Sequence, residues 1–417
     1  MRIVYFTDAY WPRVNGVTVS VQTFADALKR RGHEIRIVCP EYPEDREATG
    51  PTDELGVIRI PSVGSFFSKE DRFSNPLKLV DILPQLDAFN PDVVHVQTEF
   101  SFGTMGRHYC RTRGYPVVST CHTHWEQYFE HYIPGMPSRF ARAIARTIMR
   151  TAYRNDSLIV VPSQQIAKVL TAYGIKKEFP LIPTGIDADF FKPNAARDER
   201  VARALLERFP GLAIGPFLLF VGRVGQEKNV AFLFEVLKRV LAVRPDATLL
   251  LVGDGPYRSV LQKRSVDMGL KDSCLFTGYM PREELPSIYA MADIFVFPSK
   301  TETQGLVTIE SMLCGTPVVA IGEMGTADVM AGDNGGFMVK DNLEDFTARV
   351  LQLLDDDALR AAKSAEALEY AQRWTVEGMT DKLEVLYRRA AAARLPKGRG
   401  PVAMLRHWLW KFRRAVS

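Results

Sequence analysis

Two carboxylates flank Gly305 in the stretch TETQGLVTIESM, which covers residues 301–312. Glu302 precedes the glycine, and Glu310 lies beyond it in an apolar pattern that predicts a helix. A carboxylate does not bind phosphate, but it accepts two hydrogen bonds from a pair of sugar hydroxyls. Taken alone, the two acids fit an ordinary loop acid and an ordinary helix acid equally well. Together they suggest a ligand that carries both negative charge and hydroxyl groups.

The predicted helix start supplies the positive charge that such a ligand needs. Gly305 would open the helix, so the backbone amides of Leu306 and Val307 are its first donors. Free amides at a helix start bind anions such as phosphate. We therefore expect phosphate at the helix start, with the hydroxyls of one sugar on Glu302 and a ribose diol on Glu310.

A second loop, GRVGQEKN at residues 222–229, adds two cations between a predicted strand and a predicted helix. Arg223 offers a fork of donors and Lys228 a compact charge, which together suit a diphosphate. The spacing is not that of a Walker A loop. Two solvated surface cations are the alternative, and the neighbouring loop argues against it.

Other polar residues carry weaker signals. His122 and His124 could bind a metal, but two histidines alone make an incomplete site. The D-x-D pattern at Asp187 and Asp189 lies in a turn-rich linker, so we interpret it as a turn. Asp8 could face an acceptor, although a turn role is slightly favoured. No metal site and no bound cofactor are predicted.

These loops must be positioned by a βα scaffold. Apolar runs without alternation predict parallel strands buried on both faces, at 2–6, 35–39, 93–96, 116–120, 157–161, 217–221, 247–252, 273–276, 294–298 and 317–320. The chain therefore reads as α/β, with two doubly wound Rossmann-like domains facing a cleft. We place the domains at 1–190 and 191–390, with terminal helices in the second, and a basic aromatic tail at 391–417.

Composition sets broad limits. The chain has 417 residues, 46% hydrophobic and 24% charged, with a net charge of +4, which describes a globular protein of about two domains. The five cysteines are scattered, which favours reduced thiols and a cytoplasmic location. The opening residues read as a strand rather than a signal peptide, and no apolar run is long enough to span a membrane.

Two basic segments suggest a membrane surface. Residues 138–155 contain no acid, and arginines at helical spacing share one face, namely Arg139, Arg142, Arg146, Arg150 and Arg154. Phe140, Ile144 and Ile148 lie away from that face, as in a helix that lies on an anionic bilayer. The alternative is a crossover helix that buries its apolar face. In the tail, Trp408 and Trp410 stand among basic residues, which suits a bilayer interface, a docked end helix or a disordered end. No motif indicates nucleic acid.

Taken in order, the motifs resemble the retaining nucleotide-sugar glycosyltransferases of family four, which have the GT-B fold. The resemblance rests on E-x7-E at 302–310, GR-x4-K at 222–228, NGV at 15–17, VGDGP at 252–256 and CGTPVVA at 314–320. IPTGID at 182–187 stands where the family often has IPNGVD. The likeness covers about residues 1–390. Three segments, namely TETQGLV, HTHWEQYFEHYIPG and the basic helix that follows it, resemble those of enzymes that glycosylate diacylglycerol.

The resemblance implies roles for individual residues. Glu302 would contact the donor sugar and Glu310 the ribose, while Arg223 and Lys228 would neutralise the diphosphate leaving group. Gly16 would let the backbone approach the phosphate. His122 would line the acceptor side. Family members keep the anomeric configuration without a strong general base, and no obligatory metal is expected.

The sequence therefore predicts transfer of a hexose from a UDP- or GDP-linked sugar to a lipid hydroxyl, in particular diacylglycerol. The protein would be peripheral on the anionic cytoplasmic face of the cell membrane. One alternative is the same donor chemistry on a soluble glycan. Another is a membrane-associated protein that binds nucleotide sugars without catalysis.

Overall fold

The computed structural model describes residues 1–13, 15–42, 56–64, 72–122, 125, 137–302 and 304–393. The chain divides into two compact units. The first unit consists of Met1–Pro162, Ile166–Gly185 and the chain from Met379, and the second of Ser163–Gln165 and Ile186–Gly378. The sequence pattern predicts a boundary at residue 190 and a second domain that extends to residue 390. The structure instead returns the chain to the first unit at Met379.

The first unit contains a six-stranded parallel sheet in the order β3-β2-β1-β6-β7-β8. Every residue of the central strand β6 is buried, as expected for a parallel strand covered on both faces. The strands are β1 Arg2–Phe6, β2 Glu34–Pro40, β3 Val57–Ile60, β6 Val93–Val96, β7 Val117–Thr120 and β8 Leu158–Val160, and a short antiparallel ribbon pairs β4 Val63–Gly64 with β5 Arg72–Phe73.

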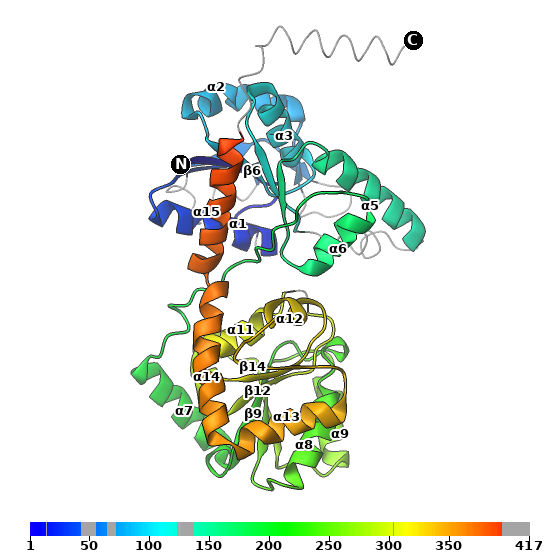
Figure 1. Ribbon diagram of the computed structural model, residues 1–417, viewed down its shortest axis with the longest axis vertical. Helices are drawn as coiled ribbons and strands as arrows, with labels where there is room; N and C mark the ends of the chain where they lie inside the picture. The colour runs from blue at the N-terminus through cyan, green and yellow to red at the C-terminus, as the bar shows by residue number, and fades with distance from the viewer. Residues whose placement is uncertain are drawn as a thin grey trace. The chain divides into compact units, whose positions relative to one another are not determined.

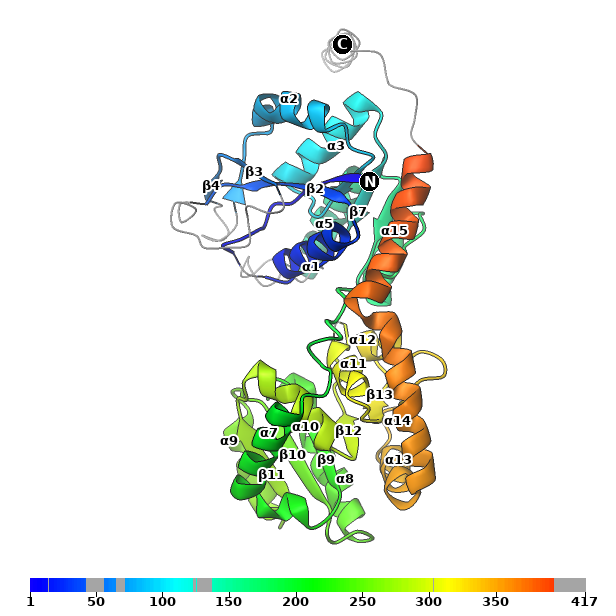
Figure 2. The same cartoon turned by 90° about the vertical axis from the view of Figure 1, so that its left-hand side faces the viewer.

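Helices cover both faces of this sheet. Figure 2 shows α2 and α3 on one side of β1, β2 and β3, and α1 on the other. Asn15 caps α1 by accepting a hydrogen bond from the amide of Thr18, and Lys29 and Arg30 complement the dipole in its last turn. The helices are α1 Gly16–Arg30, α2 Leu79–Phe89, α3 Ser101–Arg113, α5 Ser138–Tyr153, α6 Gln164–Ala172 and α15 Val376–Ala392.

The helix α15 is held to the first unit by a buried polar chain. The hydroxyl of Tyr387 lies 3.0 Å from that of Tyr5 and 2.6 Å from Nδ1 of His95, and Nε2 of His95 lies 2.8 Å from the Thr120 hydroxyl. Burial lowers the pKa of His95 to about 3, so this imidazole is neutral. At the rim, Arg31 pairs with Asp381 at 2.6 Å. Polar groups from distant parts of the chain thus satisfy one another in the core.

The second unit repeats the architecture. Its six parallel strands have the order β11-β10-β9-β12-β13-β14, and β9, β10, β12 and β13 are buried throughout. Uninterrupted apolar runs such as FLLFV and TLLLV give this pattern. The strands are β9 Phe217–Val221, β10 Thr248–Val252, β11 Cys274–Gly278, β12 Ile294–Phe297, β13 Val318–Ile321 and β14 Gly336–Val339.

The helices of the second unit are α7 Ala195–Arg208, α8 Ala231–Leu241, α9 Arg258–Asp267, α10 Leu285–Met291, α11 Leu306–Leu313, α12 Met324–Val329, α13 Leu343–Asp355 and α14 Asp357–Ala371. Short 3₁₀ turns cover Pro210–Ala213, Gln226–Lys228, Arg282–Glu284 and Gln372–Trp374, and another in the first unit covers Pro76–Lys78. Helix α8 packs beside α13 (Figure 1), and α10 packs beside α7 and α11 (Figure 2).

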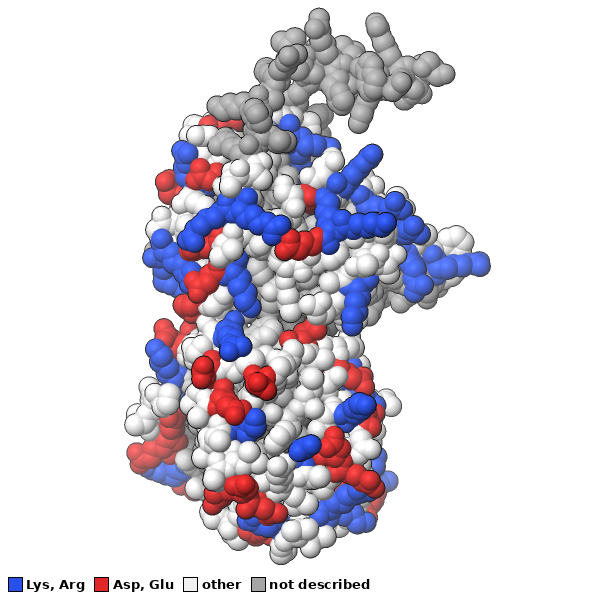
Figure 3. All heavy atoms as spheres, in the orientation of Figure 1, with Lys and Arg blue, Asp and Glu red and all other residues white. Residues whose placement is uncertain are grey.

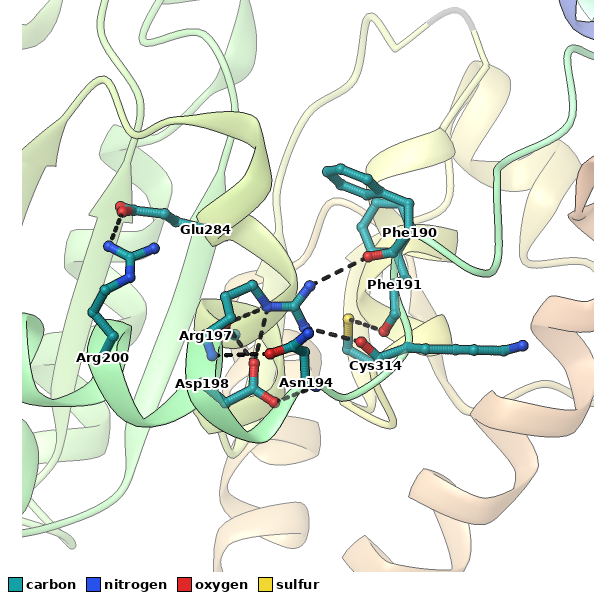
Figure 4. A network of polar contacts seen from close by, with 10 residues as sticks. Phe190, Phe191, Asn194, Arg197, Asp198, Arg200, Glu284 and Cys314 are labelled. Atoms are coloured by element: carbon teal, nitrogen blue, oxygen red, sulfur yellow. Dashed lines mark hydrogen bonds and ion pairs between the residues drawn. The ribbon is translucent and has the colours of Figure 1, made fainter.

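A polar network fixes α7 and α10 against the chain that enters the second unit. Arg197 of α7 donates to the carbonyls of Phe190 and Lys192, and Asp198 accepts a 2.6 Å hydrogen bond from Ser287 of α10 (Figure 4). Arg200 pairs with Glu284 just before α10 at 2.8 Å. The network therefore fixes the position of α10, which carries a residue of the candidate site.

Candidate active site

The loop after β9 is clamped by the loop after β10. The amides of Gly222 and Val224 donate to the carbonyls of Val252 and Asp254 at 3.0 and 2.9 Å. Gly253 has a φ of +132°, and a Cβ there would lie 1.9 Å from the carbonyl oxygen of Gly222, so only glycine fits. The clamp holds the backbone of Arg223, whose side chain is exposed.

Lys228 and Glu302 contact each other directly. Lys228 ends the 3₁₀ turn Gln226–Lys228, and the next residue, Asn229, adopts a left-handed conformation and donates to the carbonyl of Pro298 at 3.2 Å. The loops after β9 and β12 are thereby joined. Nζ of Lys228 lies 2.8 Å from Oε2 of Glu302, with 18% and 20% of the two side chains exposed. The sequence predicted both residues as ligand contacts, but not this pairing.

The start of α11 has the geometry that the sequence suggested. Gly305 has a φ of +67°, and a Cβ there would lie 2.7 Å from Cγ2 of Val329 and 2.8 Å from the carbonyl oxygen of Gly325. Among the residues that the structure describes, no side chain caps the helix at Gly305, and the next two residues, Leu306 and Val307, are only half-buried. Their amides have no partner within the helix, so they are suited to an anion.

Glu310 lies one turn inside α11 and contacts a residue that the sequence analysis missed. The hydroxyl of Tyr289, from α10, lies 3.1 Å from Oε2 of Glu310. Burial raises the pKa of Glu310, and the hydrogen bond from Tyr289 opposes that rise. Tyr289 is fully buried, and nothing in its local sequence separates it from an ordinary core aromatic.

Three buried polar atoms beside these groups have no partner among the described residues. They are the hydroxyls of Ser299 and Thr326 and Oε1 of Gln304. Ser299 and Gln304 belong to the loop that carries Glu302, and Thr326 follows Gly325, whose amide donates to the Glu302 carbonyl at 2.8 Å. Orphaned polar atoms in a core call for a water or a polar ligand. The position of these three atoms favours a water molecule or a polar ligand near the start of α11.

The first unit contributes a separate set of residues at the carboxyl end of its own sheet. Nε2 of His122, which follows β7, lies 2.8 Å from Oε1 of Gln97, which follows β6. Because that oxygen only accepts, His122 carries its proton on Nε2 and leaves Nδ1 as an acceptor. Burial lowers the pKa of His122 to about 4. Gln97 gave no signal in the sequence.

Comparison with known proteins identifies the family. The model of "Glycosyltransferase Family 4" matches residues 14–190, and that of "Glycosyl transferases group 1" matches residues 213–374. The alpha-monoglucosyldiacylglycerol synthase of Streptococcus pneumoniae is 33% identical over 325 residues, which are 77% of this chain and 71% of that protein. The chain belongs to glycosyltransferase family 4.

Other relatives support the same assignment. The GDP-mannose-dependent alpha-mannosyltransferase of Mycolicibacterium smegmatis is 32% identical over 340 residues, which are 81% of this chain and 84% of that protein. The crystal structure of Anabaena HepE in complex with UDP aligns with a TM-score of 0.67 at 18% identity, covering 93% of this chain and 99% of that one. The two Rossmann-like domains of the GT-B fold and a glycosyltransferase activity are thereby confirmed.

The start of α1 in this family 4 glycosyltransferase is sterically open at Gly16. A Cβ on Gly16 would meet no atom of the described residues within 4 Å. The open space permits the close backbone approach that the sequence predicts, although a small side chain would also fit. The phosphate contact at Gly16 stays a prediction.

Asp8 contacts the start of α3 in this glycosyltransferase, whereas the sequence favoured a turn role for it. Its carboxylate accepts hydrogen bonds from the Ser101 hydroxyl at 2.8 Å and the Phe102 amide at 2.9 Å, so it caps α3. Asp187 accepts from the amide of Asp189 at 3.0 Å, which confirms the turn interpretation. His124 lies outside the described residues, and no cluster of three potential metal ligands occurs within them.

The basic helix of this glycosyltransferase is α5. Its arginines Arg139, Arg142, Arg146 and Arg150 are exposed, and Figure 3 shows blue side chains along this part of the first unit. The helix buries a stripe of Ala141, Ala145, Met149 and Tyr153 in the core, while Phe140 and Ile144 remain 53% and 41% exposed. The helix therefore packs on its domain as a crossover helix and still presents apolar groups beside cations.

The remaining membrane predictions concern the chain's end. Trp408 and Trp410 lie outside the described residues. Within the described part of the chain, no helix is both long and apolar enough to cross a bilayer.

Proposed function

We propose that this family 4 enzyme transfers a hexose from a nucleotide diphosphate sugar to a lipid hydroxyl, with diacylglycerol as the first acceptor to test. The observation that carries the donor half is the contact of Lys228 with Glu302 beside the uncapped start of α11. One cation, one carboxylate and free amides lie on joined loops, as a charged sugar donor requires.

The proposed chemistry follows from these groups. Departure of the nucleoside diphosphate places negative charge on the leaving oxygen, and Arg223, Lys228 and the α11 amides would stabilise that charge in the transition state. Glu302 would accept hydrogen bonds from the donor sugar, and Glu310 from the ribose diol. These cations supply the positive charge that a metal ion would otherwise provide, so we propose no obligatory metal.

The reaction would retain the anomeric configuration. We propose that the acceptor attacks from the face that the diphosphate leaves, and that the leaving phosphate takes the acceptor proton. No strong base is needed in this scheme. His122 is neutral and offers Nδ1 as an acceptor, which suits hydrogen bonding to a hydroxyl rather than binding a charged group.

The lipid half of the proposal is supported by α5 and by the relatives. The protein of Streptococcus pneumoniae is named as an alpha-monoglucosyldiacylglycerol synthase, and α5 presents arginines together with exposed Phe140 and Ile144. Such a surface suits the anionic cytoplasmic face of a membrane. The protein would act there as a peripheral enzyme.

The test is a panel of UDP- and GDP-linked hexoses, each offered with diacylglycerol in phosphatidylglycerol vesicles, with products identified by mass spectrometry. A glycolipid formed from one donor supports the proposal and names the sugar. Proton NMR of its anomeric centre tests retention. Donor hydrolysis without glycolipid would move the acceptor to a soluble glycan, and donor binding without any turnover would favour a non-catalytic protein.

A further inference from the structure

A groove of about 660 Å³ runs between α3 and α5, two helices of the first unit that Figure 1 labels. This volume falls within the range of about 300–1,000 Å³ that ligand pockets occupy. The groove is mainly apolar, and its apolar walls comprise Phe73, Phe100, Val117, Ile148 and Ala152. The reaction at the nucleotide-sugar site uses none of these residues.

The buried charged groups that line the groove are already satisfied by protein partners, whereas Arg111 is exposed. Arg107 pairs with Asp156 at 2.9 Å and donates to the carbonyl of Thr98 at 3.1 Å. Glu99 accepts hydrogen bonds from Tyr153 and, at 3.1 Å, from Nε1 of Trp125, and burial raises its pKa to about 7. A hydrocarbon ligand in the groove would therefore leave no buried charged group without a hydrogen-bond partner. A sugar in the groove could not form hydrogen bonds with these groups, because they already bond to the protein.

The groove spans the depth of the sheet. Glu99 and Phe100, at one end, belong to the loop that follows the carboxyl end of β6, and Gln97 and His122 lie at the same edge. Val117 and Asp156, at the other end, lie at the amino ends of β7 and β8. A chain lying in the groove would have one end at the edge where His122 stands.

Helix α5 extends the groove with exposed apolar groups. At 3.6 residues per turn, Phe140 and Ile144 fall within about 60° of Thr147 and Thr151, which line the groove. The same helix carries a face of arginines, namely Arg139, Arg146 and Arg150, whose mean direction lies about 110° around the helix axis from that of these four residues. On the facing wall, α3 contributes Arg111. An apolar path flanked by cations matches the acyl chain of a lipid in an anionic bilayer.

We propose that this groove binds an acyl chain of the acceptor lipid and so places the lipid's free hydroxyl at the carboxyl edge of the first sheet. This rests on the proposed function, because it assumes a lipid acceptor. It adds a chain-length requirement that the donor site does not impose.

The first experiment locates the chain without requiring turnover. The protein is irradiated with phosphatidylglycerol vesicles that contain diacylglycerol with a diazirine at the end of one acyl chain, and the labelled peptides are identified by mass spectrometry. Labels on the groove faces of α3 and α5 support the proposal. Labels elsewhere, or none, overturn it.

The second experiment uses matched tryptophan variants of α5. Thr151→Trp fills the groove, whereas Ala143→Trp adds the same bulk to an exposed position outside it. Thr151→Trp should raise KM for dioleoylglycerol by about tenfold, because the chain loses burial, and should leave KM for dibutyrylglycerol unchanged. Ala143→Trp should change neither constant. Equal effects on long and short chains, or no effect, overturn the groove, whereas absence of any glycolipid overturns the lipid function itself.

Discussion

The two units share one scaffold and differ at the carboxyl edges of their sheets. Each unit contains a sheet of six parallel strands. When these strands are numbered along the chain, their order across the sheet is 3-2-1-4-5-6 in both units. In the second unit that edge carries the Lys228–Glu302 ion pair and an uncapped helix start. In the first unit it carries a neutral histidine and the mouth of an apolar groove. The shared scaffold thus determines where ligands bind, and the loops determine whether the site suits a charged or an apolar ligand.

Loss of the second unit's cation should have the largest effect. Lys228→Ala should lower kcat/KM for the nucleotide sugar by about 10³-fold, which corresponds to about 4 kcal/mol in activation free energy. The reason is that no cation at this position would then stabilise the charge of the leaving group. Steady-state kinetics with the donor that the nucleotide-sugar panel selects would measure the loss. Lys238→Ala, an exposed cation on α8, is the matched control. A loss below about threefold, with unchanged thermal stability, would remove Lys228 from the chemistry.

Replacing Glu302, the partner of Lys228, should change nucleotide affinity and sugar transfer in opposite directions. In Glu302→Gln, Lys228 no longer has a competing carboxylate, so the affinity for the bare nucleoside diphosphate should rise several-fold. Transfer should fall by about 10²-fold, because a carboxylate acceptor for the sugar is lost. Calorimetry and kinetics on one preparation give both numbers. If nucleotide affinity falls, the ion pair helps to build the site instead of competing for it.

Neutralising α5 tests the first unit's side of the comparison. The double variant Arg146→Gln, Arg150→Gln should weaken binding to phosphatidylglycerol vesicles by about 30-fold, at about 1 kcal/mol for each arginine. Added salt should weaken the unmodified protein's binding in the same direction. Vesicle sedimentation measures this, and nucleotide affinity serves as the control. Binding that is unaffected by both changes would place the membrane contact elsewhere.

The smallest expected effect concerns Tyr289, a positioning residue for Glu310. Tyr289→Phe should weaken nucleoside diphosphate binding by about fivefold, because an ionised carboxylate loses a hydrogen bond. Ribose binding needs the carboxylate, so affinity falls as pH drops through the Glu310 pKa. Without Tyr289 that pKa rises further, and the loss of affinity should begin at a higher pH. Calorimetry across pH 5–8, at intervals of about half a unit, reports it. An unchanged pH profile would reduce Tyr289 to a packing role.

Much of the scaffold could be predicted from the sequence. Long runs of buried apolar residues marked β1, β6, β9 and β12 almost to the residue. The short edge strands β3 and β14 were missed because half-exposed residues interrupt their apolar pattern. The return of α15 to the first unit depends on Tyr387 meeting Tyr5 and His95, and no local pattern encodes such a contact.

The candidate site was predictable where glycine or charge marked a loop. Gly305 and Lys228 stand beside turns that the sequence displays. Gln97 and Tyr289 act through side chains brought together from distant segments, so their local sequence resembles that of ordinary core residues. The groove is likewise a property of how α3 and α5 pack, and neither helix reveals it alone.

The polar chain that holds α15 has a practical consequence for dividing the protein. A fragment ending at Gly185 would lack α15, and the hydroxyl of Tyr5 and Nδ1 of His95 would lose the Tyr387 contact. Buried polar groups left unpaired destabilise a core by about 1–3 kcal/mol each. The first unit should therefore fold on its own only when the helix is supplied, as a separate peptide or through a linker that rejoins Gly185 to Met379.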